Sequence, residues 1–168
     1  MICCVTGHRP KGFPFPYDPM GIEYMLYFDT LFCEIEKMIK EGYRDFITGM
    51  AEGADIDFAK CVLYFRSKED VTLEAALPYP IRPQKKITEY IENRDDILME
   101  CDKKIIVSPY YYKGCMQKRN QYMVDKSDIV LAIWNNNFKG GTWNTIKYAR
   151  SKGKPIRYIM LNDNLLTR

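Results

Sequence analysis

The sequence has little of what marks a membrane, secreted or metal-binding protein. No apolar run approaches the length that spans a bilayer, so we expect no membrane partner. No basic region precedes the apolar stretch that begins at Ile2, so we expect no signal peptide. The chain has one histidine, and its six cysteines form neither a CxxC motif nor a cluster with that histidine. The common zinc motifs are therefore absent, and we expect neither a metal nor a cofactor.

A strong charge of either sign is also missing. The chain carries 25 basic and 22 acidic residues, which gives a net charge of +3. This balance permits an anionic small-molecule ligand, whereas a nucleic-acid partner favours a strongly basic face. Several cysteines fall in predicted strands or on apolar helix stripes, which indicates reduced thiols in a cytoplasmic protein. These are Cys3 and Cys4 in a strand, and Cys33 and Cys61 on helices. Cys115 lies near the candidate site and could be reactive, but burial is the commoner state of a free cysteine.

What is present is an alternation of apolar strands and amphipathic helices. The 168 residues, 46% hydrophobic, predict one domain over 1–168, with a loose tail at 161–168. The predicted strands cover 2–6, 46–48, 72–77, 104–107, 129–134 and 156–160. The predicted helices cover 22–40, 54–66, 85–100, 116–126 and 142–151. The first helix is expected to bury a stripe of Ile22, Met25, Phe28, Phe32, Ile35 and Ile39.

Strands without a polar face, separated by helices, are typical of a parallel sheet covered on both sides. With right-handed crossovers, the sequence predicts an α/β, Rossmann-like, doubly wound and mostly parallel sheet with helices on both faces. Ligands of such folds bind at the carboxyl ends of the strands. The residues that follow the strands are therefore the candidate site: Gly7, His8, Arg9, Gly49, Met50, Ala51, Gly53, Asp55, Pro78, Tyr79, Gly140, Gly141 and Thr142.

Two glycine turns stand out among these residues. Gly140 and Gly141 precede Thr142, a residue suited to cap a helix, and two glycines are more than capping needs. Gly49 and Gly53 lead into another helix, and glycines there let a phosphate approach the backbone closely. Either turn could instead be a tight structural connection. Neither matches a Walker A loop or a GxGxxG motif.

Charged and aromatic residues near these turns have two interpretations each. Arg9 suits bidentate binding of phosphate. His8 is either a hydrogen-bond donor to phosphate or a structural group. Asp55 and Asp57 could bind a divalent metal, but pairing with the helix dipole is favoured. Several aromatics could stack on a base, form a subunit contact or simply pack. They are Phe13, Phe15, Tyr17 and Tyr110 to Tyr112.

Three motifs carry a resemblance to known families. The stretch from Thr48 to Asp55, TGMAEGAD, resembles a turn of the DNA-processing protein A family. The helix that carries Arg119 and Asn120, with the Gly-Gly-Thr loop, resembles the Lonely Guy phosphoribohydrolases. Together with TGHRP at the start, these motifs place the chain in the SLOG superfamily, nearest its YpsA-like branch.

The resemblance implies a pocket for a nucleotide or nucleotide sugar, and a homodimer is plausible. Arg119 matches the catalytic arginine of the phosphoribohydrolases, but Thr145 stands where they have a catalytic glutamate. A binder, such as a sensor or regulator, is therefore the first hypothesis. An N-glycosidase that acts on nucleoside monophosphates, with another acid such as Glu52 or Asp55, is the second. Single-stranded DNA binding is the third, and the modest charge disfavours it.

Overall fold

A computed structural model describes residues 1–81 and 86–162, and within them six parallel strands form one sheet. The strand order is β4-β3-β2-β1-β5-β6. The strands are β1 (Ile2–Gly7), β2 (Asp45–Thr48), β3 (Thr72–Leu77), β4 (Lys103–Ile106), β5 (Ile129–Trp134) and β6 (Ile156–Met160). The sheet grows one way from β1 to β4, and the other way through β5 and β6. This reversal places the switch point between β1 and β5 and confirms the doubly wound α/β prediction.

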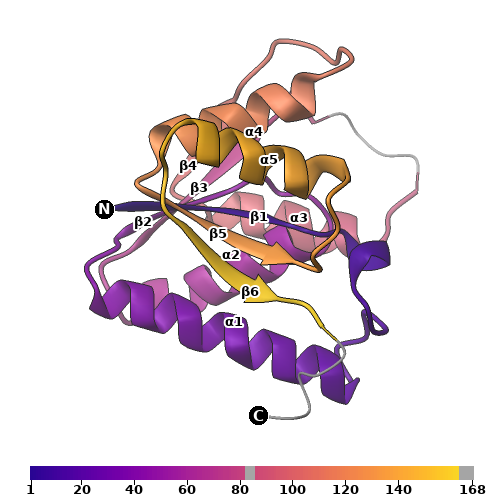
Figure 1. Cartoon of the computed structure of the whole chain (residues 1–168), viewed down its shortest axis with the longest axis vertical. Coiled ribbons are helices and arrows are strands. Elements are labelled where there is room, and N and C mark those ends of the chain that lie inside the picture. The colour runs from indigo at the N-terminus through magenta and orange to yellow at the C-terminus, as the bar shows by residue number, and fades with distance from the viewer. Residues whose placement is uncertain (82–85, 163–168) are drawn as a thin grey trace.

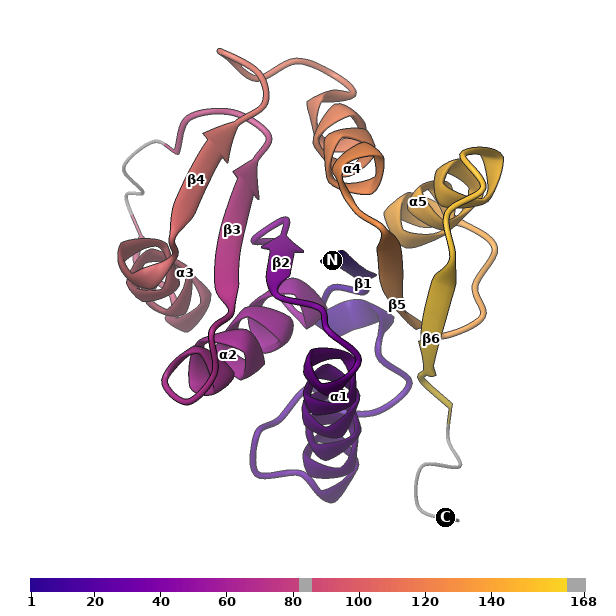
Figure 2. The ribbon, with the colours of Figure 1, turned by 90° about the vertical axis from the view of Figure 1, so that its left-hand side faces the viewer.

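Helices cover both faces of the sheet (Figures 1 and 2). One layer holds α1 (Ile22–Lys40), α2 (Ala54–Arg66) and α3 (Glu89–Glu100), and the other holds α4 (Cys115–Lys126) and α5 (Gly140–Ser151). A short 3-10 helix, η1 (Pro10–Gly12), follows β1. In the described part of the chain, no helix is both long and apolar enough to cross a membrane.

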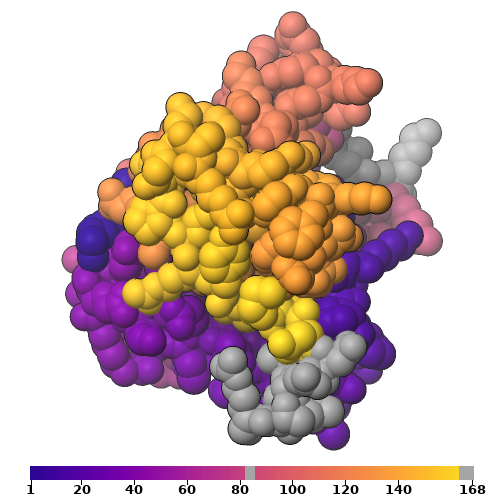
Figure 3. Space-filling model, viewed as in Figure 1, coloured from indigo at the N-terminus to yellow at the C-terminus, as the bar shows by residue number. Residues whose placement is uncertain are grey.

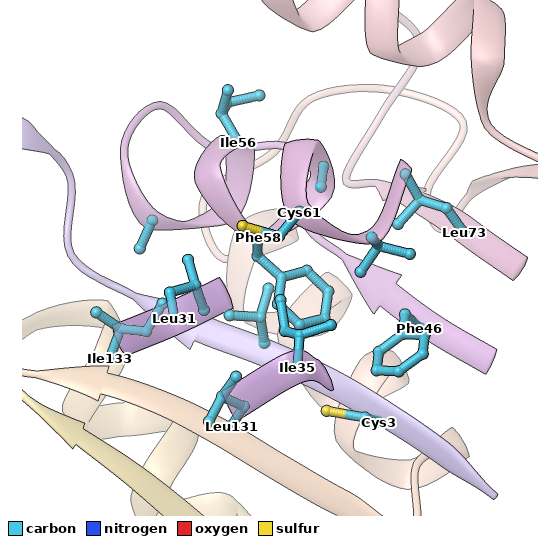
Figure 4. Packing of buried hydrophobic residues seen from close by; sticks show 14 of the residues in the cluster. Cys3, Leu31, Ile35, Phe46, Ile56, Phe58, Cys61, Leu73, Leu131 and Ile133 are labelled. Atoms are coloured by element: carbon cyan, nitrogen blue, oxygen red, sulfur yellow. The ribbon is translucent and has the colours of Figure 1, made fainter. Parts of the chain in front are cut away.

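The largest core cluster lies between the sheet and the layer of α1 and α2. Figure 4 shows Phe58 of α2 directed toward Ile35 of α1. The rings of Phe58 and Phe46 of β2 lie with their centroids 6.0 Å apart. Ala54, Phe58, Cys61, Val62 and Phe65 of α2 are all buried and form the side of the helix that faces this core. This packing fixes the N-terminus of α2 against the carboxyl ends of β1 and β2, where the candidate site lies.

The stripe predicted for α1 is wrong at its N-terminal end. Ile22 and Met25 are 61% and 51% exposed, whereas Tyr24 and Tyr27 are buried. The reason is the side chain of Asp57, which accepts hydrogen bonds from both tyrosine hydroxyls at 2.8 and 3.1 Å. A partner for the hydroxyl makes the burial of a tyrosine ring favourable, and this partner lies far away in the sequence.

Other boundaries differ in smaller ways. Helix α3 begins at Glu89, not at 85, because the Thr88 hydroxyl caps it by accepting a hydrogen bond from the Ile91 amide at 3.3 Å. Residue 85, the predicted start of this helix, lies outside the described residues. Leu161, which we expected to begin a loose tail, is buried. Its amide donates a hydrogen bond to the Trp134 backbone carbonyl at 2.8 Å. Residues 163–168 of that tail also lie outside the described part.

The thiols follow the expected pattern with one exception. Cys3, Cys4, Cys61 and Cys115 are buried, and the described cysteines are free thiols. Burial raises the pKa of Cys4 to about 12, so this thiol stays protonated at neutral pH. Cys33 is exposed, so its place on an apolar stripe is a wrong prediction. Cys33 is exposed because α1 buries a different face from the one that the sequence predicted.

Candidate functional site

Two adjoining cavities lie at the carboxyl edge of the sheet, where the predicted site residues follow their strands. Their volumes are about 370 and 380 Å³, within the size range of ligand pockets. Arg9, Ala51, Met116 and Arg119 line both cavities, so these residues form the boundary between two lobes of one site. We call the lobes the aromatic lobe and the polar lobe.

The aromatic lobe is bounded by the ends of β2 and β3, by α3 and by the loop before α4. The residues that line it besides the shared four are Gly49, Met50, Leu77, Pro78, Tyr79, Ile81, Tyr90, Arg94 and Tyr111. The Tyr79 and Tyr111 rings meet edge to face with centroids 5.4 Å apart. The Tyr90 hydroxyl donates a hydrogen bond to the Met50 carbonyl at 2.8 Å, which ties α3 to the β2–α2 turn. Flat, partly polar rings around a cavity favour a planar aromatic ligand group.

The polar lobe lies at the switch point between β1 and β5. The residues that line it besides the shared four are Val5, Thr6, Gly7, His8, Lys11, Gly12, Asp55, Asn120, Gly141 and Thr142. It lies against the first turns of α2 and α5, to which Asp55 and Gly141 belong. Backbone N–H groups in the first turn of a helix have no partner within that helix, and they carry partial positive charge.

The β2–α2 turn is held by its own side chains. The Thr48 hydroxyl donates to the Asp55 carbonyl at 2.9 Å and accepts from the Met50 amide at 3.2 Å. Met50 takes a positive φ of 58°, which is uncommon for a residue other than glycine. Gly53 has a φ of 97°, and a Cβ there would lie 2.5 Å from the His8 carbonyl oxygen. Gly53 lines neither lobe, so its role here is to let this turn pack against the loop after β1.

Arg119 and Asp55 converge on Gly49. The Arg119 Nη1 donates a hydrogen bond to the Gly49 carbonyl, and its Nε donates to the Asn120 side chain at 2.8 Å. The Asp55 Oδ2 accepts from the Ala51 amide at 3.2 Å. A Cβ on Gly49 would clash with the Arg119 guanidinium and lie 2.7 Å from Asp55 Oδ2. Glycine at this position therefore lets the two charged groups meet at the boundary of the lobes.

Burial and mutual attraction act in opposite directions on this pair. Burial raises the pKa of the Asp55 carboxyl above its ordinary value, and the positive charge of Arg119 opposes that rise. Burial lowers the pKa of Arg119, and the charge of Asp55 opposes that fall. Because the ordinary pKa of arginine lies far above neutrality, the guanidinium remains charged at neutral pH. The site thus holds a buried cation beside a carboxyl that is easier to protonate than usual.

Helix α5 begins earlier than expected. It starts at Gly140 with Lys139 as its N-cap, so Thr142 is not the cap that the sequence suggested. The Thr142 hydroxyl instead donates to the Gly7 carbonyl at 2.9 Å and ties α5 to the end of β1. Gly140 and Gly141 face open space, because a Cβ on either would meet no atom within 4 Å among the described residues.

Thr145, which the sequence resemblance places opposite the phosphoribohydrolase glutamate, is held by contacts within the protein. Its hydroxyl accepts from Asn120 Nδ2 at 2.9 Å and donates to the Gly141 carbonyl at 3.0 Å. Together with Asn120 it joins α4 to α5. Thr145 is buried and does not line either lobe.

His8 lines the polar lobe as a neutral group. Burial lowers the pKa of this imidazole below its usual range, so it is uncharged at neutral pH. The loop that carries His8 is fixed by Asn135, whose Nδ2 donates to the Gly12 carbonyl at 2.7 Å. Arg9 beside it is exposed and reaches both lobes.

Asp57 belongs to the core instead of a metal site. It is 1% exposed and accepts hydrogen bonds from the hydroxyls of Tyr17, Tyr24 and Tyr27 at 2.7, 2.8 and 3.1 Å. Burial raises the pKa of this carboxyl, and the three hydroxyl donors oppose the rise. Within residues 1–81 and 86–162, no group of three or more potential ligands could hold a metal ion.

The structure brings most of the predicted site residues together. Thirteen of the fifteen line one lobe or the other, and Gly53 and Gly140 line neither. Tyr90, Arg94 and Met116 were missed as lining residues. Tyr90 falls within the predicted helix 85–100, outside the residues that directly follow a strand. Nothing in the sequence signals that this end of α3 folds over the β2–α2 turn.

A six-stranded, doubly wound parallel sheet with a cavity at its switch point defines a Rossmann-like α/β fold. The chain matches the model of the YspA SLOG family over residues 3–164, and it therefore belongs to this YpsA-type family.

Two further similarities accompany the family match. Over 137 residues the chain is 30% identical to the uncharacterized SPbeta prophage-derived protein YoqJ of Bacillus subtilis strain 168, covering 73% of this chain and 79% of YoqJ. Its fold is similar to that of DNA processing protein A from Streptococcus pneumoniae, with a TM-score of 0.63 and 14% identity. That match covers 98% of this chain and 53% of the other, so the chain spans about half the length of that protein. At this identity the likeness concerns the fold alone.

Proposed function

We propose that the protein binds a nucleotide or nucleotide sugar across the two lobes. The observation that carries this proposal is the pair of adjoining cavities that share Arg9 and Arg119. One cavity is polar and lies against two helix N-termini, and the other is lined by tyrosines. A nucleotide has the same division, with an anionic group and a planar base joined by a sugar. Membership in the SLOG family supports a nucleotide-related role in general.

The phosphate belongs in the polar lobe. Arg9 is exposed at its rim and free to form a bidentate contact with a phosphate. The first turn of α5 offers backbone N–H groups at Gly141, where no side chain blocks the approach. Arg119 is already bonded to the Gly49 carbonyl, so its role is to supply positive charge at the boundary of the lobes.

The base belongs in the aromatic lobe. Tyr79, Tyr90 and Tyr111 offer ring faces or edges, and Pro78 and Met50 complete an apolar wall. Arg94 is 9% exposed, and its guanidinium carbon lies 5.7 Å from the centroid of the Tyr90 ring. A planar base packed among these rings would be held by stacking. Stacking accepts any of the bases, because every base has a π-face.

Thermal unfolding and calorimetric titration with AMP, ADP, NAD and ADP-ribose test this proposal. A ligand at about 100 times its dissociation constant stabilises the fold by about 2.7 kcal/mol. For a domain of this size, that corresponds to a rise in melting temperature of about 5–10 °C. The Arg9→Ala variant should lose at least tenfold in affinity without losing stability, because Arg9 is exposed.

Lys118→Ala is the matched control, because Lys118 is an exposed cation of α4 that lines neither lobe. Its affinity should equal that of the unmodified protein. Arg119→Ala should abolish binding, and circular dichroism must accompany it because Arg119 is buried and holds the Gly49 carbonyl. If no nucleotide shifts the melting temperature, or if Arg9→Ala binds as tightly as Lys118→Ala, the proposal fails.

A second candidate function is hydrolysis of the N-glycosidic bond of a nucleoside monophosphate. The observation that favours it is Asp55, a carboxyl with a raised pKa that lines the polar lobe beside Arg119. In such a step, the C1′–N bond breaks and the acid donates its proton to the leaving base, while water adds to C1′ and releases a proton that restores the carboxyl. Asp55 would be the acid, and Arg119 would position the phosphate end.

Chromatography of free base from AMP, GMP, CMP and UMP, with and without the protein, tests this activity. Turnover that disappears in Asp55→Asn while calorimetric binding persists would support it. Binding without release of base across the four nucleotides would leave the protein as a binder.

A further inference from the structure

A second surface outside the two lobes combines aromatic rings with positive charge. Its residues come from the end of β5, the loop that follows, α5 and β6. Figure 3 shows α5 and β6 on the side of the molecule that faces the viewer. Four aromatic side chains form its centre, which we call the aromatic platform: Trp134, Phe138, Trp143 and Tyr158.

The rings of the platform are arranged in a fixed stack. Trp134 and Trp143 are parallel, with centroids 5.5 Å apart and an interplanar angle of 8°. Phe138 meets both indoles edge to face, at 5.1 and 4.9 Å. Trp134 is 5% exposed and forms the floor, whereas Phe138 is 58% exposed and Tyr158 is 38% exposed. Large rings held open to solvent in this way mark an interaction surface more often than isolated exposed residues do.

The loop that carries Phe138 is held in place by hydrogen bonds. The Trp134 indole donates to the Asn137 carbonyl at 3.0 Å. The Asn135 and Asn137 side chains accept from the amides of Asn137 and Lys139 at 3.0 and 3.1 Å. The ring of Phe138 is therefore presented to solvent by an ordered loop, which lowers the entropy lost when a partner binds.

The charge of this segment has one sign. Between residues 129 and 161 the sequence has six basic and no acidic residues, whereas the rest of the chain has 19 basic and 22 acidic residues. Three of the six are at the platform. The Lys147 Nζ and the Arg150 guanidinium carbon lie 5.9 and 5.4 Å from the Trp143 ring centroid, and Lys139 adjoins Phe138 in the chain. Among the described residues, no carboxylate lies within 4.0 Å of any of these three cations.

The remaining basic residues of this segment are engaged elsewhere. Lys152 pairs with Asp125 at 3.5 Å, and Arg157 pairs with Glu34 at 2.9 Å. Lys154 donates to the Ser127 carbonyl at 2.5 Å. Their charges are directed toward α4 and α1, so the excess positive charge of this face rests on Lys139, Lys147 and Arg150.

From this arrangement we infer that the aromatic platform and its three cations bind single-stranded nucleic acid. Flat rings on which bases stack, flanked by cations that neutralise the backbone, are the two parts of sequence-tolerant single-strand binding. A protein partner would have to supply apolar side chains that pack on these rings. The three unneutralised cations around the rings favour a polyanion instead. A second copy of this chain is disfavoured, because two such surfaces would bring six cations together.

The two tryptophans of the chain provide the measurement, because both lie in the platform. Titration with a twelve-nucleotide oligothymidylate should quench tryptophan fluorescence as bases stack on Trp143. Three phosphate contacts predict a slope of about −2 for the logarithm of affinity against that of salt concentration. Affinity should accordingly fall about 20-fold between 50 and 200 mM salt.

Two variants separate stacking from charge. Phe138→Ala removes an exposed ring and should weaken binding at least about fivefold, within the range for one stacked base. Lys147→Glu with Arg150→Glu should weaken it at least about tenfold and flatten the salt slope. The matched control is Lys37→Glu with Lys40→Glu, the same spacing and charge change on exposed positions of α1, across the sheet. This control should bind like the unmodified protein.

Three outcomes would overturn the inference. The first is an oligothymidylate affinity that stays unchanged in Phe138→Ala and in the double variant Lys147→Glu with Arg150→Glu. The second is equally tight binding of an abasic oligomer of the same length, which would show that charge alone acts. The third is a tryptophan spectrum that changes on dilution together with a dimer-to-monomer shift in size-exclusion chromatography, which would assign the platform to a second copy. Trp134 and Trp143 line neither lobe, so a change in their fluorescence reports on the platform and not on the proposed nucleotide site.

Discussion

Two glycine turns look alike in the sequence but differ in the structure. At the β2–α2 turn, a Cβ on Gly49 or Gly53 would collide with protein atoms, and Asp55 and Asp57 in the first turn of α2 are engaged by other groups. At the β5–α5 turn, a Cβ on Gly141 would meet no described atom within 4 Å. The β2–α2 turn uses glycine because neighbouring protein atoms leave no room for a side chain. The β5–α5 turn leaves the start of α5 open on the side of the polar lobe.

The comparison shows that glycine before a helix has two separate uses. One use satisfies the packing of the fold, and its substitution should reduce stability. The other keeps a backbone accessible, and its substitution should reduce binding alone. Substitutions of these glycines, and of the two aspartates beside the β2–α2 turn, test how far that turn serves packing and the β5–α5 turn serves binding. Their expected effects on stability decrease from Asp57→Ala to Gly141→Ala.

Asp57→Ala should have the largest effect. The substitution leaves the hydroxyls of Tyr17, Tyr24 and Tyr27 without their acceptor, and each buried unsatisfied group costs about 1–3 kcal/mol. We expect a loss of about 3–5 kcal/mol in the free energy of unfolding, measured by urea denaturation. Asp57→Asn keeps an acceptor oxygen and should lose less. Equal losses in the two variants would contradict the assignment of these hydrogen bonds.

Gly53→Ala should come next. The new Cβ would lie 2.5 Å from the His8 carbonyl oxygen, at a φ of 97° that side chains rarely adopt. Backbone strain and overpacking each cost about 1–3 kcal/mol, so we expect a loss of about 3 kcal/mol. Chemical denaturation measures it, and a variant as stable as the unmodified protein would show that this turn is not filled as described.

The buried carboxyl of Asp55 predicts a pH dependence of stability. Its folded pKa lies above its unfolded value of 3.8, so between the two values the folded state binds more protons than the unfolded state. The free energy of unfolding must therefore fall as pH rises through this window. Asp55→Asn removes the titration and should flatten this part of the profile. A parallel profile in the variant would mean that Asp55 does not titrate there.

Gly141→Ala should change stability least. The site is open, and alanine favours a helix by about 1 kcal/mol or less, so stability should hold or rise slightly. The methyl group would however stand between the first turn of α5 and a phosphate in the polar lobe. We expect a tenfold or larger loss of nucleotide affinity, measured by calorimetry beside the thermal unfolding curve. A stable variant with full affinity would show that the phosphate does not approach this turn.

The sequence predicted the fold because its signals are local and repeated. Alternating apolar runs and amphipathic segments suffice for a parallel sheet, and strands β3, β5 and β6 have the predicted bounds. The stripe of α1 could not be predicted in the same way. Its tyrosines are buried only because Asp57, thirty residues or more away, supplies an acceptor for their hydroxyls.

For the candidate site, the sequence by itself determined which residues gather, because the carboxyl ends of parallel strands meet at one edge. Most of the predicted lining followed from this rule. Only the tertiary structure decided what each residue does there. Thr145 is bonded to Asn120 and not free for chemistry, Gly53 fills a packed turn, and Tyr90 of α3 lies over the β2–α2 turn. Those roles depend on the partners that distant segments bring, and the local sequence carries no signal of a distant partner.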